Sequence, residues 1–309
     1  MSNISNLVAE KAGYPNLLDD LNNKLSGSEL NTLLLELFRK RVRKISPAGL
    51  LKDFDKNRFS APSTIETISF KQFEIRCLEV AAEKDFSIVT LSPLRSLGAC
   101  SVIGYVDQNN VVSALRGTEI ISDATNVFAL MIAKEFKKRK TNRVIKYATT
   151  HRHVRSQALS NPAFTPHFGV FCMATGGLDK GNFSFELQHL LEHMQIHLSL
   201  LSDEFEKEKL FIKIFLKDDN EIFYQKLQEA LNNFTSIKIE KESNAGNYYT
   251  LVQFKFFLNH EGKEINLSDG GFVDWTQKLI PNKKHRLIIS GIGTELIHKI
   301  KHPPSNQTL

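Results

Sequence analysis

Two segments decide the fold class of this chain: "VIKYATT" at 144–150 and "FGVFCMA" at 168–174. Both are short runs rich in β-branched and aromatic residues, which is typical of buried strands. The segment 151–167 between them is predicted to be a long hairpin arm. A further long strand is predicted over 248–258. Long adjacent strands favour an α+β fold, an antiparallel sheet flanked by helices on one face, over a doubly wound parallel sheet.

The pattern around these strands predicts an irregular alternation of elements. Shorter strands are expected at 86–91, 111–115, 211–216, 237–241 and 287–290, and helices at 123–139, 184–201, 220–232 and 272–279, with a terminal helix after them.

The N-terminal part of the chain is predicted to be a helical layer. Apolar residues recur there at the three-and-four spacing of one buried helix face: Leu30, Leu33, Leu34, Leu37, Phe38 and Val42. Ser46 and Pro47 are typical of the start of a further helix. The segment 61–63 breaks the pattern, and Ser69 with Gln72 predicts the start of the next helix. We therefore expect a helical N-terminal region at 1–62 and a second domain at 63–309.

Composition excludes several classes of protein. The 309 residues are 41% hydrophobic and 24% charged, which excludes disordered, collagen-like and repeat proteins. The net charge of +6 is too small to indicate a nucleic-acid partner. Three cysteines without a CxxC spacing exclude a disulfide framework and a cysteine-rich zinc site. Uninterrupted apolar stretches of ~18 residues do not occur, so a cytoplasmic protein without a membrane partner is expected.

The sequence lacks the GxSxG, GxxxxGK[ST] and strand-GxGxxG motifs. The string "YATTHRHVR" at 147–155 is more informative, because Arg152, Arg155 and the later His167 could form a cationic pocket for a phosphate or carboxylate. The alternative interpretation is a solvated hairpin tip.

Histidines and basic residues form two further patterns. His189, His193 and His197 lie four apart on a predicted helix, beside a core stripe at 187–201. Such a spacing permits a shared metal, but without HExxH or a comparable signature we predict no metal site. Basic clusters at 39–44 and 137–143 are interpreted as solvated helix ends.

Taken in order, these strings resemble the catalytic domain of class II aminoacyl-tRNA synthetases. The resemblance covers about residues 66–300 and is nearest to histidyl-tRNA synthetase and its paralogue that activates ATP phosphoribosyltransferase. The segments that carry it are 70–91 (motif 1), "DQNNVVSALR" at 107–116 (a strand ending in "LRP"), 151–155 with 167–176 (motif 2 and its return strand), "GNYYT" at 246–250 ("GLDYYTG"), "DGGFVD" at 269–274 ("GGRYD") and "GIGTEL" at 291–296 (motif 3).

The resemblance implies a ligand cleft and a homodimer formed through motif 1. The residues that it assigns to ligand binding are Arg116, Glu119, Arg152, Arg155, His167, Tyr248 and Tyr249. It assigns no catalytic residue. In particular, it implies that Arg116, Arg152, Arg155 and His167 converge on one cleft.

The sequence also departs from the family pattern. Val154 stands in place of the motif 2 glutamate and Leu296 in place of the motif 3 arginine, so ATP with Mg²⁺ is expected to bind weakly. Ala245 stands in place of the arginine that precedes "GLDYYTG", and Phe272 in place of the arginine within "GGRYD". Both changes argue against histidine as a substrate. The sequence ends shortly after the motif 3-like segment, so an anticodon-binding domain and a tRNA partner are not expected.

Three hypotheses follow for function. The first is a synthetase-derived paralogue that does not charge tRNA, binds a small anionic or amino-acid-like ligand and regulates a partner enzyme. The second is an ATP-dependent ligase that forms an acyl-adenylate on a non-standard substrate, with Arg155 or Lys146 compensating for the lost arginine. The third is an RNA-binding or structural module that uses the basic N-terminal helices.

Overall fold

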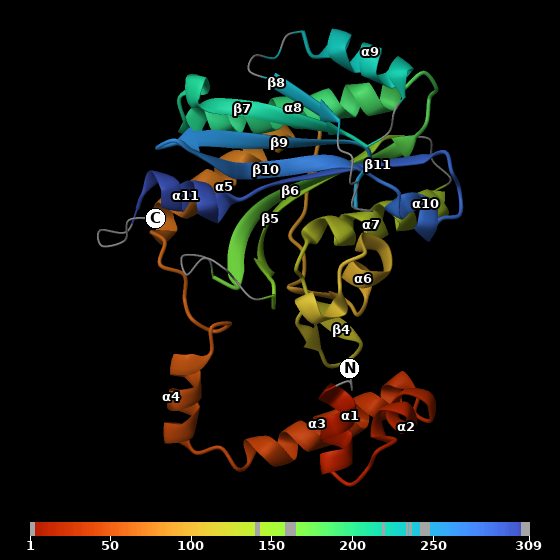
Figure 1. The fold of residues 1–309 in the computed structure, drawn as a ribbon, viewed down its shortest axis with the longest axis vertical. Helices are drawn as coiled ribbons and strands as arrows, with labels where there is room; N and C mark the ends of the chain where they lie inside the picture. The colour runs from red at the N-terminus through yellow and green to blue at the C-terminus, as the bar shows by residue number, and fades with distance from the viewer. Residues whose placement is uncertain are drawn as a thin grey trace.

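The computed structural model describes residues 4–139, 143–157, 165–217, 220–232, 234, 237–241 and 248–303. Its centre is an eight-stranded sheet in the order β1-β5-β6-β11-β10-β9-β7-β8 (Figure 1). These strands are β1 (Ser87–Ile88), β5 (Ile145–Val154), β6 (His167–Leu178), β7 (Leu210–Leu216), β8 (Ile237–Lys241), β9 (Thr250–His260), β10 (Lys263–Val273) and β11 (His285–Ile292).

The pairing of the strands confirms the predicted α+β class. β5 and β6 are antiparallel, with Ile145 opposite Gly176 and Val154 opposite His167. β9, β10 and β11 continue the antiparallel pattern, and only the outer pairs β1–β5 and β7–β8 are parallel among the described strands. The arm predicted at 151–167 begins as a continuation of β5 to Val154, and residues 158–164 lie outside the described part of the chain.

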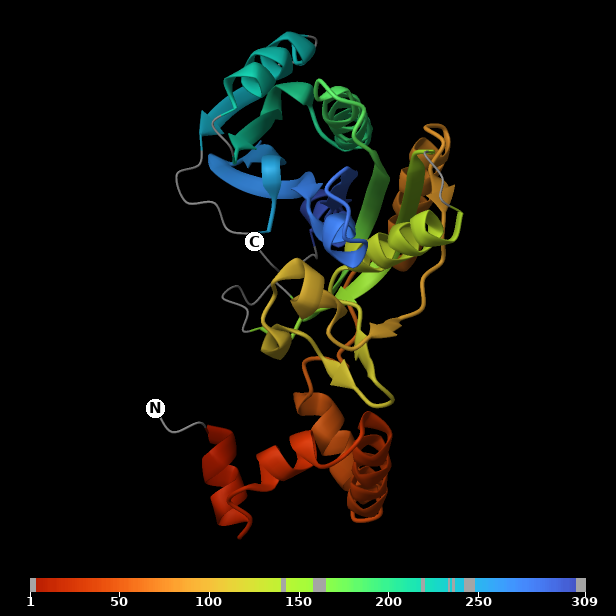
Figure 2. The same ribbon diagram turned by 90° about the vertical axis from the view of Figure 1, so that its right-hand side faces the viewer.

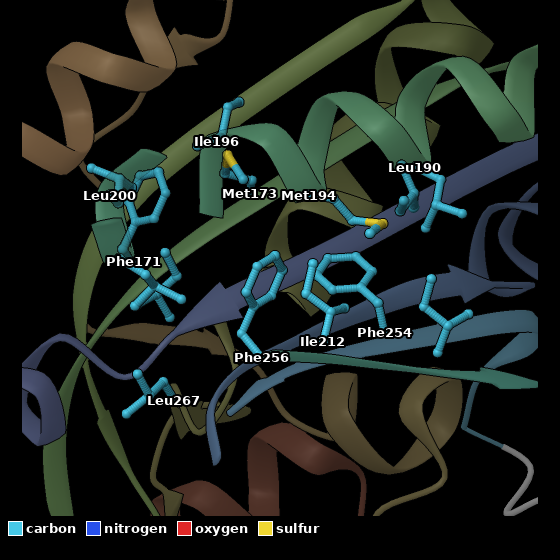
Figure 3. Close-up of a cluster of buried hydrophobic side chains, with 14 of the residues drawn as sticks. Phe171, Met173, Leu190, Met194, Ile196, Leu200, Ile212, Phe254, Phe256 and Leu267 are labelled. Carbon is cyan, nitrogen blue, oxygen red and sulfur yellow. The ribbon is translucent and has the colours of Figure 1, made fainter. Parts of the chain in front are cut away.

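Helices pack on both faces of the sheet, so the prediction that they cover one face is wrong. α5 (Thr67–Ala82), α8 (Ser184–Glu204) and α11 (Thr294–Lys301) bury the larger core on one face. Figure 3 shows Phe254 and Phe256 of β9 lying against Met194 of α8 in this core. On the other face, α7 (Ala124–Arg139) and α10 (Trp275–Leu279) bury a second core around Phe128 and Trp275. α9 (Glu221–Ala230) packs against α8.

Several elements were not predicted from the sequence. β10 was not predicted because its first half, "KEINLSD", is mostly polar, and such a composition resembles that of a loop. A second, three-stranded sheet forms from β3 (Ser113–Ala114), which lies within the strand expected at 111–115, and from β2 (Leu94–Ser96) and β4 (Thr118–Ile120), which were not predicted; it lies next to α6 (Ala99–Gly104). These strands of two or three residues are too short to show a period. Short 3₁₀ turns at Gln108–Asn110 and Lys207–Lys209 complete the main body.

The N-terminal helices α1 (Ile4–Lys11), α2 (Leu17–Asn23), α3 (Gly27–Val42) and α4 (Pro47–Lys56) lie at one end of the molecule, away from the large sheet (Figure 2). Ser46 caps α4 by accepting a hydrogen bond from Gly49 N at 3.1 Å, as predicted. α5 starts two residues earlier than predicted because Glu66, rather than Ser69, accepts the hydrogen bonds of its first turn. The predicted burial of the α3 apolar face is wrong, since α3 has no buried residue. The domain boundary at residue 62 stays a prediction.

No described helix is both long enough and apolar enough to cross a bilayer.

Candidate functional site

A cavity of about 840 Å³ opens on the sheet beside the start of α7, and α11 contributes Glu295, Leu296 and Lys299 to its lining. Strands β5, β6, β10 and β11 form its floor, and the segment 122–125 before and into α7 forms one wall. Tyr248 and Tyr249, just before β9, form another wall. The cavity lining is mainly apolar, with a smaller number of polar side chains from parts of the chain that are far apart in the sequence, which is the usual composition of a small-molecule site.

Two carboxylates are the most distinctive groups in the cavity. Tyr248 donates a hydrogen bond to Asp123 Oδ2 at 2.7 Å, and Tyr249 donates one to Asp269 Oδ2 at 3.2 Å. The Oδ1 atom of Asp123 also accepts from the backbone N and hydroxyl of Thr125, at 2.9 and 2.7 Å. Consecutive tyrosines therefore connect the start of α7 with strand β10.

The surroundings shift the pKa values of these two carboxyl groups in opposite directions. Burial alone would raise the pKa of Asp123, but His153 and the hydrogen bonds from Thr125 and Tyr248 lower it below its ordinary value. Burial raises the pKa of Asp269; the nearby Asp123 raises it further, and its hydrogen bond with Tyr249 only partly offsets this. Asp123 is therefore the more stable anion, and Asp269 is the group whose charge a bound cation would favour.

His153 is buried on the same wall and is uncharged at neutral pH. Its Nε2 accepts a hydrogen bond from Ala124 N at 3.1 Å, and burial lowers its pKa to about 3. Cys172 Sγ lies 3.8 Å from the same nitrogen, but burial raises the pKa of this thiol well above its ordinary value. A buried neutral thiol beside a neutral imidazole is a poor nucleophile, so this pair does not indicate cysteine chemistry.

A buried ion pair holds the wall that carries Asp123. Arg95 Nε donates to Glu119 Oε1 at 2.7 Å, and both side chains are at most 1% exposed. The same guanidinium donates to Asp123 O, Asn126 Oδ1 and Ser122 Oγ at 2.7 to 2.8 Å. Glu119 also accepts from Gly98 N and Cys100 N. The pair therefore fixes the backbone around Asp123 from behind.

Cationic groups also border the cavity. Arg155 lies over the ring of Phe168, 5.3 Å from its centroid, and its Nε donates to Ser122 O at 3.3 Å. Its charge acts to lower the pKa of Asp269. Lys299 lines the cavity but forms an ion pair with Glu295 at 2.9 Å. The cavity therefore contains both signs of charge.

The structure brings together only some of the residues assigned from the sequence. Arg155, Tyr248 and Tyr249 line the cavity, whereas Glu119 lies behind its wall in the ion pair with Arg95. Arg116 is exposed at the β3–β4 turn, where its backbone N contacts Asn31 Oδ1. The expected convergence of Arg116, Arg152, Arg155 and His167 is therefore wrong.

The period of a strand explains why Arg152 and His167 lie elsewhere. Successive side chains of β5 point to opposite faces, so His153 faces the cavity and Arg152 faces α5 and α11. Arg152 Nη2 there forms an ion pair with Glu295 Oε2, and its Nε donates to His167 Nδ1 at 2.8 Å. Lys146 is on this face too, bonded to Glu192 of α8. It is therefore not placed to replace a missing arginine in the cavity.

The residues of the candidate site that sequence reasoning missed are Asp123, Asp269 and Arg95. Asp269 stands in the quoted segment "DGGFVD", so its position next to two glycines was the available signal. Asp123 read as an ordinary helix-start residue. Arg95 lies two residues after Pro93 in an unassigned stretch, and no sequence signal distinguishes it.

The histidines of α8 are part of the core. His193 contacts Thr175 Oγ1 and Ser290 Oγ at 2.9 and 2.8 Å, and His197 contacts Ser268 Oγ and Ser290 Oγ at 2.9 and 3.0 Å. They connect the helix to the sheet through hydroxyl groups. Within the described residues, no group of three or more histidine, cysteine or acidic side chains is arranged to hold a metal ion.

Comparison with known proteins relates the fold to solved structures. No protein-family model matches the chain, and no curated protein matches it either. Histidyl-tRNA synthetase from S. aureus is 15% identical, with a TM-score of 0.58 over 78% of this chain and 70% of that one.

Two further solved structures are similar. An ATP phosphoribosyltransferase regulatory subunit/histidyl-tRNA synthetase from Bacillus halodurans is 12% identical, with a TM-score of 0.58 over 80% of this chain and 83% of that one. A putative threonyl-tRNA synthetase from Aeropyrum pernix is 14% identical, with a TM-score of 0.55 over 76% and 58%. This chain therefore has the class II aminoacyl-tRNA synthetase-like fold that its sequence motifs predicted.

Proposed function

We propose that this chain is a synthetase-derived paralogue that does not charge tRNA and binds a small amino-acid-like ligand in the cavity. The observation that carries this proposal is the presence of Asp123, Asp269 and Arg155 in one cavity. Carboxylates accept hydrogen bonds from an amino group, and a guanidinium forks onto a carboxylate or phosphate. A small molecule with both a cationic and an anionic group fits this pair of charges.

The cavity gives less support to ATP chemistry. Leu296 lines the cavity where the resemblance places an arginine, and Arg152 is not among the lining residues but is engaged by Glu295. ATP and Mg²⁺ are therefore not part of the proposed ligand set. The ligase alternative depends on Arg155, which does line the cavity. Amino-acid-dependent pyrophosphate exchange with ATP distinguishes the two functions, since only the ligase would catalyse it.

We further propose that the ligand-bound chain regulates a partner enzyme in the cytoplasm and acts as a homodimer. The fold likeness to a regulatory subunit of ATP phosphoribosyltransferase supports this role. The third hypothesis, RNA binding by the N-terminal basic residues, predicts a salt-dependent shift of tRNA mobility that the leading proposal does not.

A thermal-shift screen of the twenty amino acids, ATP and phosphoribosyl compounds tests the proposal. Binding to the native state alone raises the apparent stability, so a ligand appears as a raised melting temperature. Calorimetry with each hit then measures affinity for the wild type, Asp269→Asn and Arg155→Ala. Each variant removes one charged contact worth about 1.5–3 kcal/mol, so affinity is expected to fall about ten- to hundredfold.

A matched control replaces a carboxylate far from the cavity. Asp55→Asn, on the exposed α4 helix, is expected to bind every hit as the wild type does. Equal affinity of Asp269→Asn, Arg155→Ala and the wild type would contradict the proposed site. A screen in which no amino-acid-like compound shifts the melting temperature would contradict the proposed ligand class.

A further inference from the structure

Most of the net charge of this chain is concentrated in one short N-terminal segment. Residues 37–56 contain seven lysine and arginine side chains and two aspartates, which gives this segment a net charge of +5. The whole chain carries +6, so the remaining 289 residues are close to neutral. Such an asymmetry is typical of a segment that contacts an anionic macromolecule or membrane.

The same segment exposes apolar side chains at high density. Seven of them are between 46% and 63% exposed: Leu37, Phe38, Val42, Ile45, Leu50, Leu51 and Phe54. Single exposed apolar residues are ordinary, but a cluster of them among cations indicates an interaction surface. We call residues 37–56 the N-terminal patch.

Helix α4 is the most accessible part of the N-terminal patch. Its side chains Leu50, Leu51 and Phe54 lie within an arc of about 100° on one side of the helix. Every residue of α4 except Gly49 is exposed, and Figure 1 shows the helix standing apart from the large sheet. A helix of 10 residues is only marginally stable alone in water, so a partner that covers its apolar side would stabilise it.

The cations of the N-terminal patch are accessible too. Five of them occupy six consecutive positions: Arg39, Lys40, Arg41, Arg43 and Lys44. Arg39 and Lys40 share Glu36, at 2.6 and 3.8 Å. Arg41, Arg43 and Lys44 are exposed, and no acidic side chain in the described part of the chain forms an ion pair with them. This run therefore presents positive charge beside the exposed apolar residues.

We infer that the N-terminal patch binds the surface of an anionic lipid bilayer, with α4 lying in the plane of the interface. The cations are attracted to acidic head groups, and the apolar side chains enter the boundary between head groups and acyl chains. A nucleic acid would use the cations but leave the aliphatic side chains in water, because bases stack on aromatic rings. The apolar residues are spread over the end of α3, the connector and α4, which suits a fluid surface better than a narrow protein groove.

This mode of binding requires no membrane-spanning segment. An interfacial helix lies on the bilayer, so the finding that no described helix can cross a membrane does not bear on it. The inference replaces two expectations from the sequence, that the chain has no membrane partner and that residues 39–44 are only a solvated helix end. It is independent of the ligand cavity, because the N-terminal patch lies outside the region that resembles synthetases (Figure 2).

Co-sedimentation of the full chain with lipid vesicles tests the inference. Phosphatidylcholine vesicles with about 30% phosphatidylserine should bind the wild type, and pure phosphatidylcholine vesicles should bind it at least about tenfold more weakly. Raising the salt concentration to about 0.5 M should weaken binding to the anionic vesicles. A wild type that binds both kinds of vesicle equally, or neither, would overturn the inference. Binding to polyuridylate without binding to anionic vesicles would overturn it as well.

Two charge variants test whether the N-terminal patch is the part that binds. Each cation near the membrane surface contributes a factor of about five, so Arg41→Gln/Arg43→Gln should weaken binding to anionic vesicles about thirtyfold. Lys137→Gln/Lys138→Gln is the matched control, because it makes the same change of net charge at exposed lysines of α7. It should bind within about twofold of the wild type. An equal loss in both variants would overturn the inference, because overall charge would then explain the binding.

Two further variants test the insertion of α4. Leu50→Gln/Phe54→Gln should weaken binding at least about tenfold, and circular dichroism checks that the fold is kept. In Leu51→Trp the new indole should shift its emission to the blue when anionic vesicles are added, whereas Trp275, the only tryptophan of the chain, is buried and should not respond. Ile222→Trp is the matched control, since Ile222 is 61% exposed in α9, and its emission should stay unchanged. An unshifted Leu51→Trp, or unchanged binding by Leu50→Gln/Phe54→Gln, would overturn the placement of α4 in the interface.

Discussion

Arg152 and Glu295 form an ion pair between strand β5 and helix α11, with Nη2 and Oε2 2.8 Å apart, and Glu295 also lines the cavity. Glu295 is 2% exposed at its side chain and also pairs with Lys299. The arginine that the motif resemblance assigns to a phosphate is thus already neutralised by a buried carboxylate. Its role in this chain is to hold helix α11 against strand β5.

We therefore predict no measurable amino-acid-dependent pyrophosphate exchange and only weak binding of Mg-ATP. Two charged contacts to phosphate are missing, because Leu296 carries no guanidinium and Arg152 is engaged by Glu295. Each contact is worth about 1.5–3 kcal/mol, so the affinity for ATP should be about two to four orders of magnitude below that of a site which has both. Calorimetry measures it directly. Leu296→Arg, which places a guanidinium at the cavity, should partly restore ATP affinity. Tight Mg-ATP binding by the unchanged chain would favour the ligase function instead.

The Arg95–Glu119 pair predicts a large effect on stability. Glu119→Gln leaves a buried guanidinium without its counter-charge, which costs about 3–5 kcal/mol of the free energy of unfolding. Urea unfolding measures the loss. The double variant Arg95→Met/Glu119→Leu removes both charges and should lose less than Glu119→Gln alone. If the double variant is the less stable of the two, the hydrogen bonds of Arg95 to Ser122, Asp123 and Asn126 matter more than the charge pair.

The buried histidines predict that acid destabilises the fold. Burial lowers the pKa of His197 to about 3, from an ordinary value of 6.5. The unfolded chain binds a proton at this residue as the pH falls through 6.5, whereas the folded chain does not until about pH 3. The contribution of His197 to the free energy of unfolding should thus be constant above pH 6.5 and fall as the pH decreases from 6.5 to about 3. Urea unfolding at a series of pH values measures the slope, and His197→Gln should reduce it by about one proton. An unchanged slope in that variant would contradict the assignment.

Contacts of Glu295 and His167 with residues 61–63 attach the segment after the N-terminal helices to the main body of the chain. Ser63 Oγ donates to Glu295 Oε1 at 2.6 Å, and Ala61 O contacts His167 Nε2 at 2.6 Å. Ser63→Ala should therefore increase the rate of limited proteolysis around residues 57–66, with little change in global stability, because one part-buried hydrogen bond is worth about 1 kcal/mol. Cleavage elsewhere, measured by mass spectrometry of the fragments, should stay as in the wild type. An equal rate at 57–66 in both chains would show that the bond does not hold this segment.

Much of the sheet could be predicted because its long strands carry strong local signals. The β5–β6 hairpin and strand β9 combine β-branched and aromatic residues over ten or more positions. Strand β10 could not be predicted in the same way, since its polar first half acquires its conformation by pairing with β9. Tertiary pairing there outweighs local preference.

The candidate site was harder to predict than the fold. β5 is covered on both faces, so apolar residues do not mark which side chains face the cavity, and a motif match can be one residue out of phase. His153 and Arg152 differ by one position, yet only His153 lines the cavity. Asp123 and Asp269 are brought together by the fold from segments more than a hundred residues apart, and no local pattern reports such proximity.

The raised pKa of Asp269 implies that ligand binding and proton release are linked. A cationic group that settles beside this carboxyl favours its charged form, so a cationic ligand that binds while Asp269 is protonated favours release of that proton. The apparent affinity for an amine should then increase with pH until Asp269 is fully ionised in the empty protein. Calorimetric heats of binding below that point should vary with the ionisation enthalpy of the buffer. The cavity would in that way report the acidity of its surroundings as well as the concentration of its ligand.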